Sequence, residues 1–261
     1  MSKIDVISQI CVFVDYPLYR QLIKKYRNKF NKVILYPSRH HGVVDLEEYL
    51  KQTLPETWIT SHTIDWTTPG IDWRQAETEP CLEQSDSEWI LFLEQDFFCD
   101  DWDKLWVDVE KAMETSDAIG WWNETHFPYL HPCFFLVKRE ALDKTKKDFR
   151  AHPEINGGDH FAMITHDLIE NGAKITKLQD LGWTDPEHAM HLGGLTYPYQ
   201  NFKGDETIIG VKYPEALATY NELLIENWET TPEFQDLAIK LKEVLKKKGF
   251  GFTFKWEKFF K

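Results

Sequence analysis

Long apolar segments are missing from this sequence. No stretch approaches the roughly 18 apolar residues that a membrane-spanning helix needs, and residues 1–5 (MSKID) do not begin a signal-peptide core. The motifs GxGxxG, GxxxxGK(S/T) and HExxH are missing as well. Their absence excludes the most common types of dinucleotide-binding, P-loop and zincin enzyme. We therefore expect a cytoplasmic protein whose chemistry depends on other residues.

Cysteine is scarce, and its spacing is uninformative for metal or redox motifs. The chain has four cysteines, none of them in a CxxC motif: Cys11, Cys81, Cys99 and Cys133. Most lie in apolar, strand-like surroundings. The pattern predicts buried, reduced thiols in a reducing compartment.

Positive charge is also in short supply. The chain has 30 Lys and Arg against 43 Asp and Glu, which gives a formal net charge of −13. A charge of this sign disfavours nucleic-acid binding by the chain as a whole.

Residues 240–261 are the exception to this acidic balance. They hold eight Lys against Glu243 and Glu257, and aromatic residues occupy every second position from 250 to 256. Three interpretations remain open. The tail forms a last strand over an aromatic cluster, or it contacts anionic lipid headgroups, or it contacts a nucleic-acid acceptor.

The rest of the chain has the composition and periodicity of a globular α/β protein. Apolar residues make up 42% of 261 residues, enough for a substantial core. Strands are expected at residues 7–14, 32–36, 58–64, 88–93, 118–122, 133–138 and 173–178. Helices are expected at residues 19–30, 46–54, 72–84 (which Pro80 can split), 103–115, 159–171, 214–227 and 231–248. The alternation predicts a doubly wound, largely parallel sheet.

Two carboxylates, Glu94 and Asp96, follow the most hydrophobic of the expected strands. In an open α/β sheet, ligands bind beyond the carboxyl ends of the strands. Carboxylate oxygens there suit Mg²⁺ or Mn²⁺ that bridges a diphosphate. An acidic turn without any ligand explains the same two residues, so both interpretations stay open at this point.

Around these acids the sequence resembles the nucleotide-sugar-dependent glycosyltransferases of GT-A fold, most nearly the family 2 type. The matching segments are WRQA (73–76), CLEQ (81–84) and EWILFLEQDF (88–97). The resemblance implies that Glu94 and Asp96 bind a divalent metal and the ribose or diphosphate of the donor. Glu94 stands where the family has Asp, and its longer side chain changes which oxygen it contacts.

The same resemblance implies that three further residues contact the donor nucleotide. Arg74 would face the uracil or the phosphates, for which its planar fork is suited. Asp15 and Asp65, after the first and third expected strands, would contact the nucleoside. A solvated helix arginine and two turn-forming or helix-capping aspartates are the alternatives.

Residues 156–161 (NGGDHF) resemble the family's Glu-Asp motif, with Gly158 in place of the usual acid. In inverting members the Asp of this motif is the general base. The resemblance therefore implies that Asp159 takes the proton of the acceptor, with Gly158 and His160 beside it. The alternative is that Asp159 only caps the helix expected from residue 159.

Residues 188–194 (HAMHLGG) form a third cluster. A His after the last core strand binds the metal in many GT-A enzymes, and His191 matches that position better than His188 does. A structural histidine is the alternative.

Residues 131–137 resemble the strand that lines the sugar pocket. This resemblance places His131, and Trp121 and Trp122 just before it, at the sugar or acceptor. Aromatic rings stack well on sugars, but core packing explains the two tryptophans equally well.

Together the resemblances cover about residues 5–200 and imply a metal-dependent hexosyl- or pentosyltransferase. It would use Mn²⁺ or Mg²⁺ and a nucleotide-sugar, in particular a UDP-sugar, with inversion if Asp159 is the base. The acceptor would be a glycan, a lipid-linked molecule or a modified nucleic acid, and the tail would allow peripheral contact with the inner membrane face.

The expected organisation is a GT-A-like catalytic domain followed by a helical extension. The catalytic domain spans residues 1–212, with a nucleotide-binding half (1–101) and an acceptor half (102–212). Residues 213–261 form the helical, basic and aromatic extension.

Three alternatives to a glycosyltransferase remain. A nucleotidyltransferase would share the sheet and the acids. A metal phosphohydrolase built on His160, His166 and Asp167 would be wholly helical. A sugar-binding domain without activity would keep the pocket and lose the chemistry.

Overall fold

The computed structural model describes residues 3–10, 23, 25–37, 57–59, 73–94, 97–124, 128–150, 161–184 and 188–191. The helices expected at 46–54, 214–227 and 231–248 and the basic tail lie outside these residues and stay predictions. No helix within the described ranges is long and apolar enough to cross a membrane.

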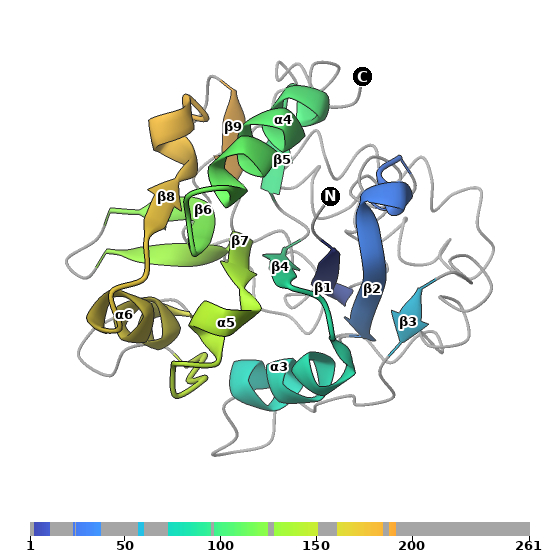
Figure 1. Ribbon diagram of the computed structural model, residues 1–261. Helices are drawn as coiled ribbons and strands as arrows, with labels where there is room; N and C mark the ends of the chain where they lie inside the picture. The colour runs from blue at the N-terminus through green and yellow to red at the C-terminus, as the bar shows by residue number, and fades with distance from the viewer. Residues whose placement is uncertain are drawn as a thin grey trace, which may run out of the picture.

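A seven-stranded sheet with the order β3-β2-β1-β4-β7-β6-β8 lies at the centre of the molecule (Figure 1). Its strands are β1 (Ile4–Ile10), β2 (Phe30–Pro37), β3 (Trp58–Ile59), β4 (Trp89–Leu93), β6 (Ala118–Asn123), β7 (Tyr129–Lys138) and β8 (Ile175–Lys177). Strands β3, β2, β1 and β4 run parallel to one another, and β8 runs parallel to β6. Strand β7 is antiparallel to both of its neighbours.

Helices lie over both faces of this sheet (Figure 1). Helix α4 covers one face, and α3, α5 and α6 cover the other. Their bounds are α3 (Trp73–Gln84), α4 (Trp102–Met113), α5 (Arg139–Leu142) and α6 (Ala162–Glu170). The expected α/β fold, a doubly wound, mixed and mainly parallel sheet flanked by helices, is confirmed.

Each face of the sheet has its own apolar core. Trp106 of α4 belongs to one core cluster and Leu168 of α6 to the other. Strand β4 supplies both clusters, Leu91 to the first and Ile90 to the second, because successive strand residues face opposite sides. This double burial explains why the strand reads as an uninterrupted apolar run.

A buried carboxylate, Asp5, fixes the start of β1 against the turn before β4. It accepts six hydrogen bonds of 2.8–3.1 Å from side-chain and backbone donors of Asn31, Lys32, Ser85, Asp86 and Ser87. Burial opposes ionisation, but these hydrogen bonds outweigh it and hold the pKa of Asp5 below its usual value. The network fixes the residue at which β4 begins. The length of β4 then determines where the strand ends.

Several sequence-based boundaries differ from the structure. The helix expected at 19–30 is wrong at its end, because Arg27–Lys29 form a 3₁₀ turn and Phe30 already pairs with Ile4 in the sheet. Strand β1 begins at Ile4, three residues before the expected start. Helix α3 runs through Pro80 without a break. Strand β7 begins at Tyr129, four residues earlier than expected.

Two short strands were not expected at all. They are β5 (Phe97–Cys99) and β9 (Ala189–His191), which form a separate antiparallel pair. Three-residue strands are too short to show a hydrophobic period.

Helix α6 also begins later than expected. Its first residue is Ala162, and the residue before it, Phe161, has a left-handed backbone with φ of 72°. The capping role considered for Asp159 is therefore wrong, because the helix starts three residues after it.

Candidate functional site

Glu94 lies directly after β4, where the parallel part of the sheet meets the antiparallel strand β7. Its side chain is buried, and its backbone N–H donates to the carbonyl oxygen of Cys133 at 3.2 Å. The last residue pair of the β4–β7 ladder is Leu93 with Phe134. The strand-end position expected for this carboxylate is confirmed.

Strand β7 carries a bulge next to this carboxylate. In the β6–β7 pairing, Gly120 lies opposite Phe135, and the next residue, Trp121, lies opposite His131. Residues 132–134 are therefore additional on β7. A bulge of this kind bends a strand and redirects its side chains.

Two residues make the bulge possible. Pro132 has no backbone N–H to place in a ladder, which suits a bulged position. A Cβ atom on Gly120 would lie 2.5 Å from the carbonyl oxygen of Phe134, a distance that no side chain tolerates. Glycine at 120 therefore lets β6 lie against the bulge.

The bulge brings His131 and Cys133 together inside the protein. The side chains are 3% and 0% exposed, and the backbone N–H of Cys133 donates to Nδ1 of His131 at 3.0 Å. The same Nδ1 lies 3.9 Å from Oε2 of Glu94.

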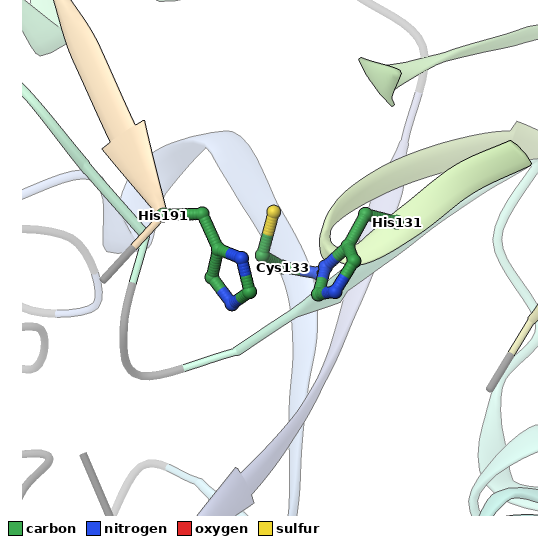
Figure 2. Close-up of side chains that lie close together, drawn as sticks. All are labelled: His131, Cys133 and His191. Carbon is green, nitrogen blue, oxygen red and sulfur yellow. The ribbon is translucent and has the colours of Figure 1, made fainter. Parts of the chain in front are cut away.

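The β5–β9 pair brings a residue from far along the chain to the same place. Phe97 lies opposite His191 in this pair. Nε2 of His191 is 3.9 Å from Oε2 of Glu94, and its ring centroid is 4.1 Å from that of His131. Figure 2 shows His131 and Cys133 of β7 beside His191 of β9.

The cluster formed by Glu94, His131, Cys133 and His191 is the candidate site. The potential ligand atoms of His131, Cys133 and His191 all lie within 4.8 Å of one another. Three members are buried, and the side chain of His191 is 21% exposed. The cluster therefore opens toward solvent on the side of His191.

His188 does not join this cluster. Its Nδ1 lies 3.0 Å from Oδ2 of Asp100, and its carbonyl oxygen accepts the N–H of Asp100 at 3.0 Å. These contacts tie the residue before β9 to the residue after β5. His188 thus holds in place the strand pair that positions His191.

The two tryptophans expected at the sugar pocket face opposite sides of the sheet. Trp121 is buried in the same core cluster as Cys133, with its ring edge-on to Phe97 at 5.7 Å. Trp122 packs against the other core cluster, under the amine of Lys177 at 4.4 Å. They cannot line one pocket together, and Trp121 is the one on the side of Cys133.

The structure does not describe the remaining predicted residues far enough to place them. Arg74 lies in helix α3, but its side chain is outside the described part. Outside the described residues altogether are Asp15, Asp65, Asp96, Gly158, Asp159 and His160. The described residues on either side of Asp96 in the chain, Glu94 and Phe97, both lie next to His191.

Sequence reasoning missed Cys133 as a member of the site and assigned His131 to the sugar pocket. The alternation of His131 and Cys133 along one strand was the available signal. The expectation of buried thiols is confirmed for Cys81, Cys99 and Cys133, and burial raises the pKa of the Cys99 thiol well above its usual value.

The donor atoms fit a divalent ion. Two atoms that each bind one ion at about 2.1 Å are at most about 4.2 Å apart. The 3.9 Å between Oε2 of Glu94 and Nε2 of His191 lies within this limit. These two residues could hold the divalent ion that the sequence resemblance implies.

A cavity of about 500 Å³ elsewhere in the molecule is a weaker candidate. It is lined by Lys3, Phe30, Glu110 and neighbouring residues, at the amino ends of β1 and β2. Ligands of open α/β sheets bind at the opposite, carboxyl ends of the strands, where Glu94 lies.

Known proteins resemble this chain in overall shape only. No protein-family model and no curated protein sequence matches it. A mannosyltransferase from Pyrobaculum calidifontis, solved with GDP-Man and Mn²⁺, is 14% identical with a TM-score of 0.49, over 93% of this chain and 70% of the other. Glucosyl-3-phosphoglycerate synthase from Mycobacterium tuberculosis, solved with Mn²⁺, UDP and phosphoglyceric acid, is 9% identical with a TM-score of 0.45, over 69% and 74%. Similarity at this level carries no activity over to this chain.

Proposed function

We propose that this protein is a metal-dependent glycosyltransferase that uses a nucleotide-sugar, in particular a UDP-sugar. The observation that carries the proposal is the position of Glu94 at the carboxyl end of β4, with Nε2 of His191 at 3.9 Å. Ligands of open α/β sheets bind at this edge. An acid followed at two residues by Asp96, with an imidazole beside it, is a donor set for a divalent ion that faces a diphosphate.

In this proposal Glu94, Asp96 and His191 hold Mn²⁺ or Mg²⁺. When bound, such an ion would supply positive charge that offsets the charge of the donor diphosphate. Arg74 pairs with the uracil or phosphates, and Asp15 and Asp65 contact the nucleoside. Residues 1–101 then form the nucleotide-binding half of the domain.

The acceptor side of the proposal falls on residues 102–212. Asp159 takes the proton from the acceptor hydroxyl, and one carboxylate in that role favours inversion at the sugar carbon. Gly158 and His160 lie beside it in sequence, and His131 and Trp121 belong to the sugar side. The support for this role is the resemblance of residues 156–161 to the family's Glu-Asp motif.

One alternative, the metal phosphohydrolase, fits the structure less well. The phosphohydrolase hypothesis required a wholly helical fold, whereas the described residues contain a seven-stranded sheet. Its candidate residue Asp167 is buried and accepts the backbone N–H of Lys146 at 3.0 Å, which is a structural role. A nucleotidyltransferase shares the sheet and the acids, and an inactive sugar-binding domain shares the pocket.

The test is hydrolysis of a panel of nucleotide-sugars with Mn²⁺ and after removal of metal by EDTA. We expect release of the nucleoside diphosphate to require the metal. Asp96→Asn and Glu94→Gln should lower this rate by about 100-fold or more, since such an ion contributes several kcal/mol. Asp143→Asn, which changes an acid whose side chain is half-exposed on another surface, serves as the matched control.

Two results would refute the proposal. One is donor cleavage that survives EDTA or Asp96→Asn. The other is release of pyrophosphate from a nucleoside triphosphate in place of sugar transfer, which would identify a nucleotidyltransferase.

A further inference from the structure

The candidate site contains a thiol and a second imidazole that an ion facing a diphosphate does not need. Magnesium and manganese bind to carboxylate, carbonyl and water oxygens, whereas thiolate and imidazole ligands suit zinc. Cys133 and His131 lie within 4.8 Å of His191, ligand atom to ligand atom. Glu94 is 3.9 Å from both imidazoles.

We infer that Glu94, His131, Cys133 and His191 form a zinc site. One sulfur, two nitrogens and one oxygen make a set of four ligands of the kinds that Zn²⁺ accepts in a tetrahedral arrangement. Because the site shares Glu94 and His191 with the proposed donor-metal site, zinc and the catalytic ion compete for it. That competition rests on the proposed function, whereas the zinc site itself does not.

Charge balance supports zinc in this buried place. The Cys133 thiol gives its proton to solvent when its sulfur binds the ion, so the thiolate and Glu94 together carry two negative charges. They neutralise Zn²⁺ when both imidazoles are neutral. A complex without net charge avoids the cost of a buried, uncompensated ion, and here three of the four ligands are buried.

The ligands are held before any ion arrives. Nδ1 of His131 lies 3.9 Å from Oε2 of Glu94 and accepts the N–H of Cys133 at 3.0 Å. A metal ion bound at this nitrogen would replace that hydrogen bond. Backbone hydrogen bonds join the end of β4 to the bulge of β7, and β9, which carries His191, pairs with β5 just after Glu94 in the chain. The partly exposed His191 provides a route of entry.

X-ray absorption of the zinc-loaded full-length protein is the direct test, because it needs no variant. We expect one zinc per chain with one sulfur neighbour at about 2.3 Å and nitrogen or oxygen neighbours at about 2.0–2.1 Å. The cobalt-substituted protein should show a thiolate-to-metal charge-transfer band. Bound zinc with only nitrogen and oxygen neighbours, or no bound zinc, overturns the inference.

Variants add a second, independent measurement by competition with a chelator. Cys133→Ala should weaken zinc binding at least about tenfold and remove the charge-transfer band, because even residues that only orient a ligand contribute about 10- to 100-fold. Cys81→Ala is the matched control, since it removes another fully buried thiol from helix α3. Equal losses in both variants, or no loss in Cys133→Ala, count against the site.

Further measurements distinguish loss of the zinc site from loss of folding and from failure of the proposed function. If Cys133→Ala does not fold, His191→Ala replaces a partly exposed ligand and should weaken zinc binding in the same way. Mn²⁺-dependent donor cleavage without sulfur-bound zinc would overturn the zinc site alone. Sulfur-bound zinc, together with no donor cleavage by the zinc-free protein in Mn²⁺, would overturn the proposed function alone.

Discussion

Asp5 illustrates how a single residue far from the site sets the position of the site. Its carboxylate gathers donors from β2 and from the turn before β4, and that turn determines where β4 starts. Glu94 lies one residue past the other end of β4. A change at Asp5 should therefore lower the stability of the fold and, through the position of β4, also displace Glu94.

We predict that Asp5→Asn lowers the free energy of unfolding by about 3 kcal/mol at pH 7. The amide nitrogen of Asn cannot accept the hydrogen bonds that the second carboxylate oxygen of Asp5 accepts, so buried donors lose their partner. The pKa of Asp5 is lowered in the folded protein. The stability it contributes is therefore complete above its unfolded pKa of about 3.9 and is lost as pH falls through the folded value. Urea unfolding at several pH values measures this, and the variant should lose that part of the acid dependence.

Asp103→Asn is the control for this prediction. The pKa of Asp103 is also lowered, by hydrogen bonds from Tyr26 and Lys25, but its side chain is 70% exposed. Water screens such a pair, so the loss should be much smaller. Equal losses in the two variants would show that the buried network contributes no more to the free energy of unfolding than the exposed pair does.

Among the structural elements, the bulge of β7 and the β5–β9 pair build the cluster. The bulge places His131 and Cys133 at the end of β4, and β9 adds His191 from the opposite side. The bulge contains only three additional residues, and each strand of the β5–β9 pair is only three residues long. Small changes in backbone packing there should therefore move the ligands.

We predict that Gly120→Ala destabilises the protein by about 1–3 kcal/mol, since the added Cβ overlaps the backbone of the bulge. It should also weaken zinc binding, because the bulge positions His131 and Cys133, two of the four proposed zinc ligands. Gly172→Ala is the matched control. It has a φ of +74° and no atom within 4 Å of its Cβ position, so it costs about 1–2 kcal/mol of backbone strain.

The measurements are urea unfolding and zinc competition for both variants. The expected pattern is similar destabilisation in both, with weaker zinc binding in Gly120→Ala only. Unchanged zinc affinity in a folded Gly120→Ala protein would show that the bulge does not position the ligands.

Local patterns made part of this arrangement predictable. The apolar run before Glu94 predicted a buried strand with an acid at its end, and the structure has both. The resemblance implied that His191 lies near Glu94, as it does. The pairing of Phe97 with His191 was not predictable from local patterns, because it joins two strands of three residues that lie far apart in sequence. Cys133 was missed because its apolar surroundings favoured a buried structural thiol, as for the other cysteines.

At the scale of the whole molecule, charge is distributed unevenly along the chain. The chain carries a net charge of −13, yet residues 240–261 hold eight Lys against two acids, a local charge of about +6. The remainder is thus near −19. A basic, aromatic segment attached to an acidic protein favours a contact with an anionic surface that the rest of the chain would repel.

If the tail docks on an anionic surface, we predict that truncation after Lys240 weakens binding to vesicles that contain anionic lipid and leaves metal-dependent donor cleavage intact. The tail holds none of the residues proposed for chemistry, so cleavage by water should continue. Rising salt should weaken vesicle binding of the full chain in the same way, because it screens the lysines. Replacing Lys246, Lys247 and Lys248 by Gln, with the aromatic residues kept, separates charge from apolar contact in a co-sedimentation assay. A truncated protein that is unfolded would instead show that the aromatic residues at 250–256 complete the core, and unchanged vesicle binding would remove the tail from any role in docking.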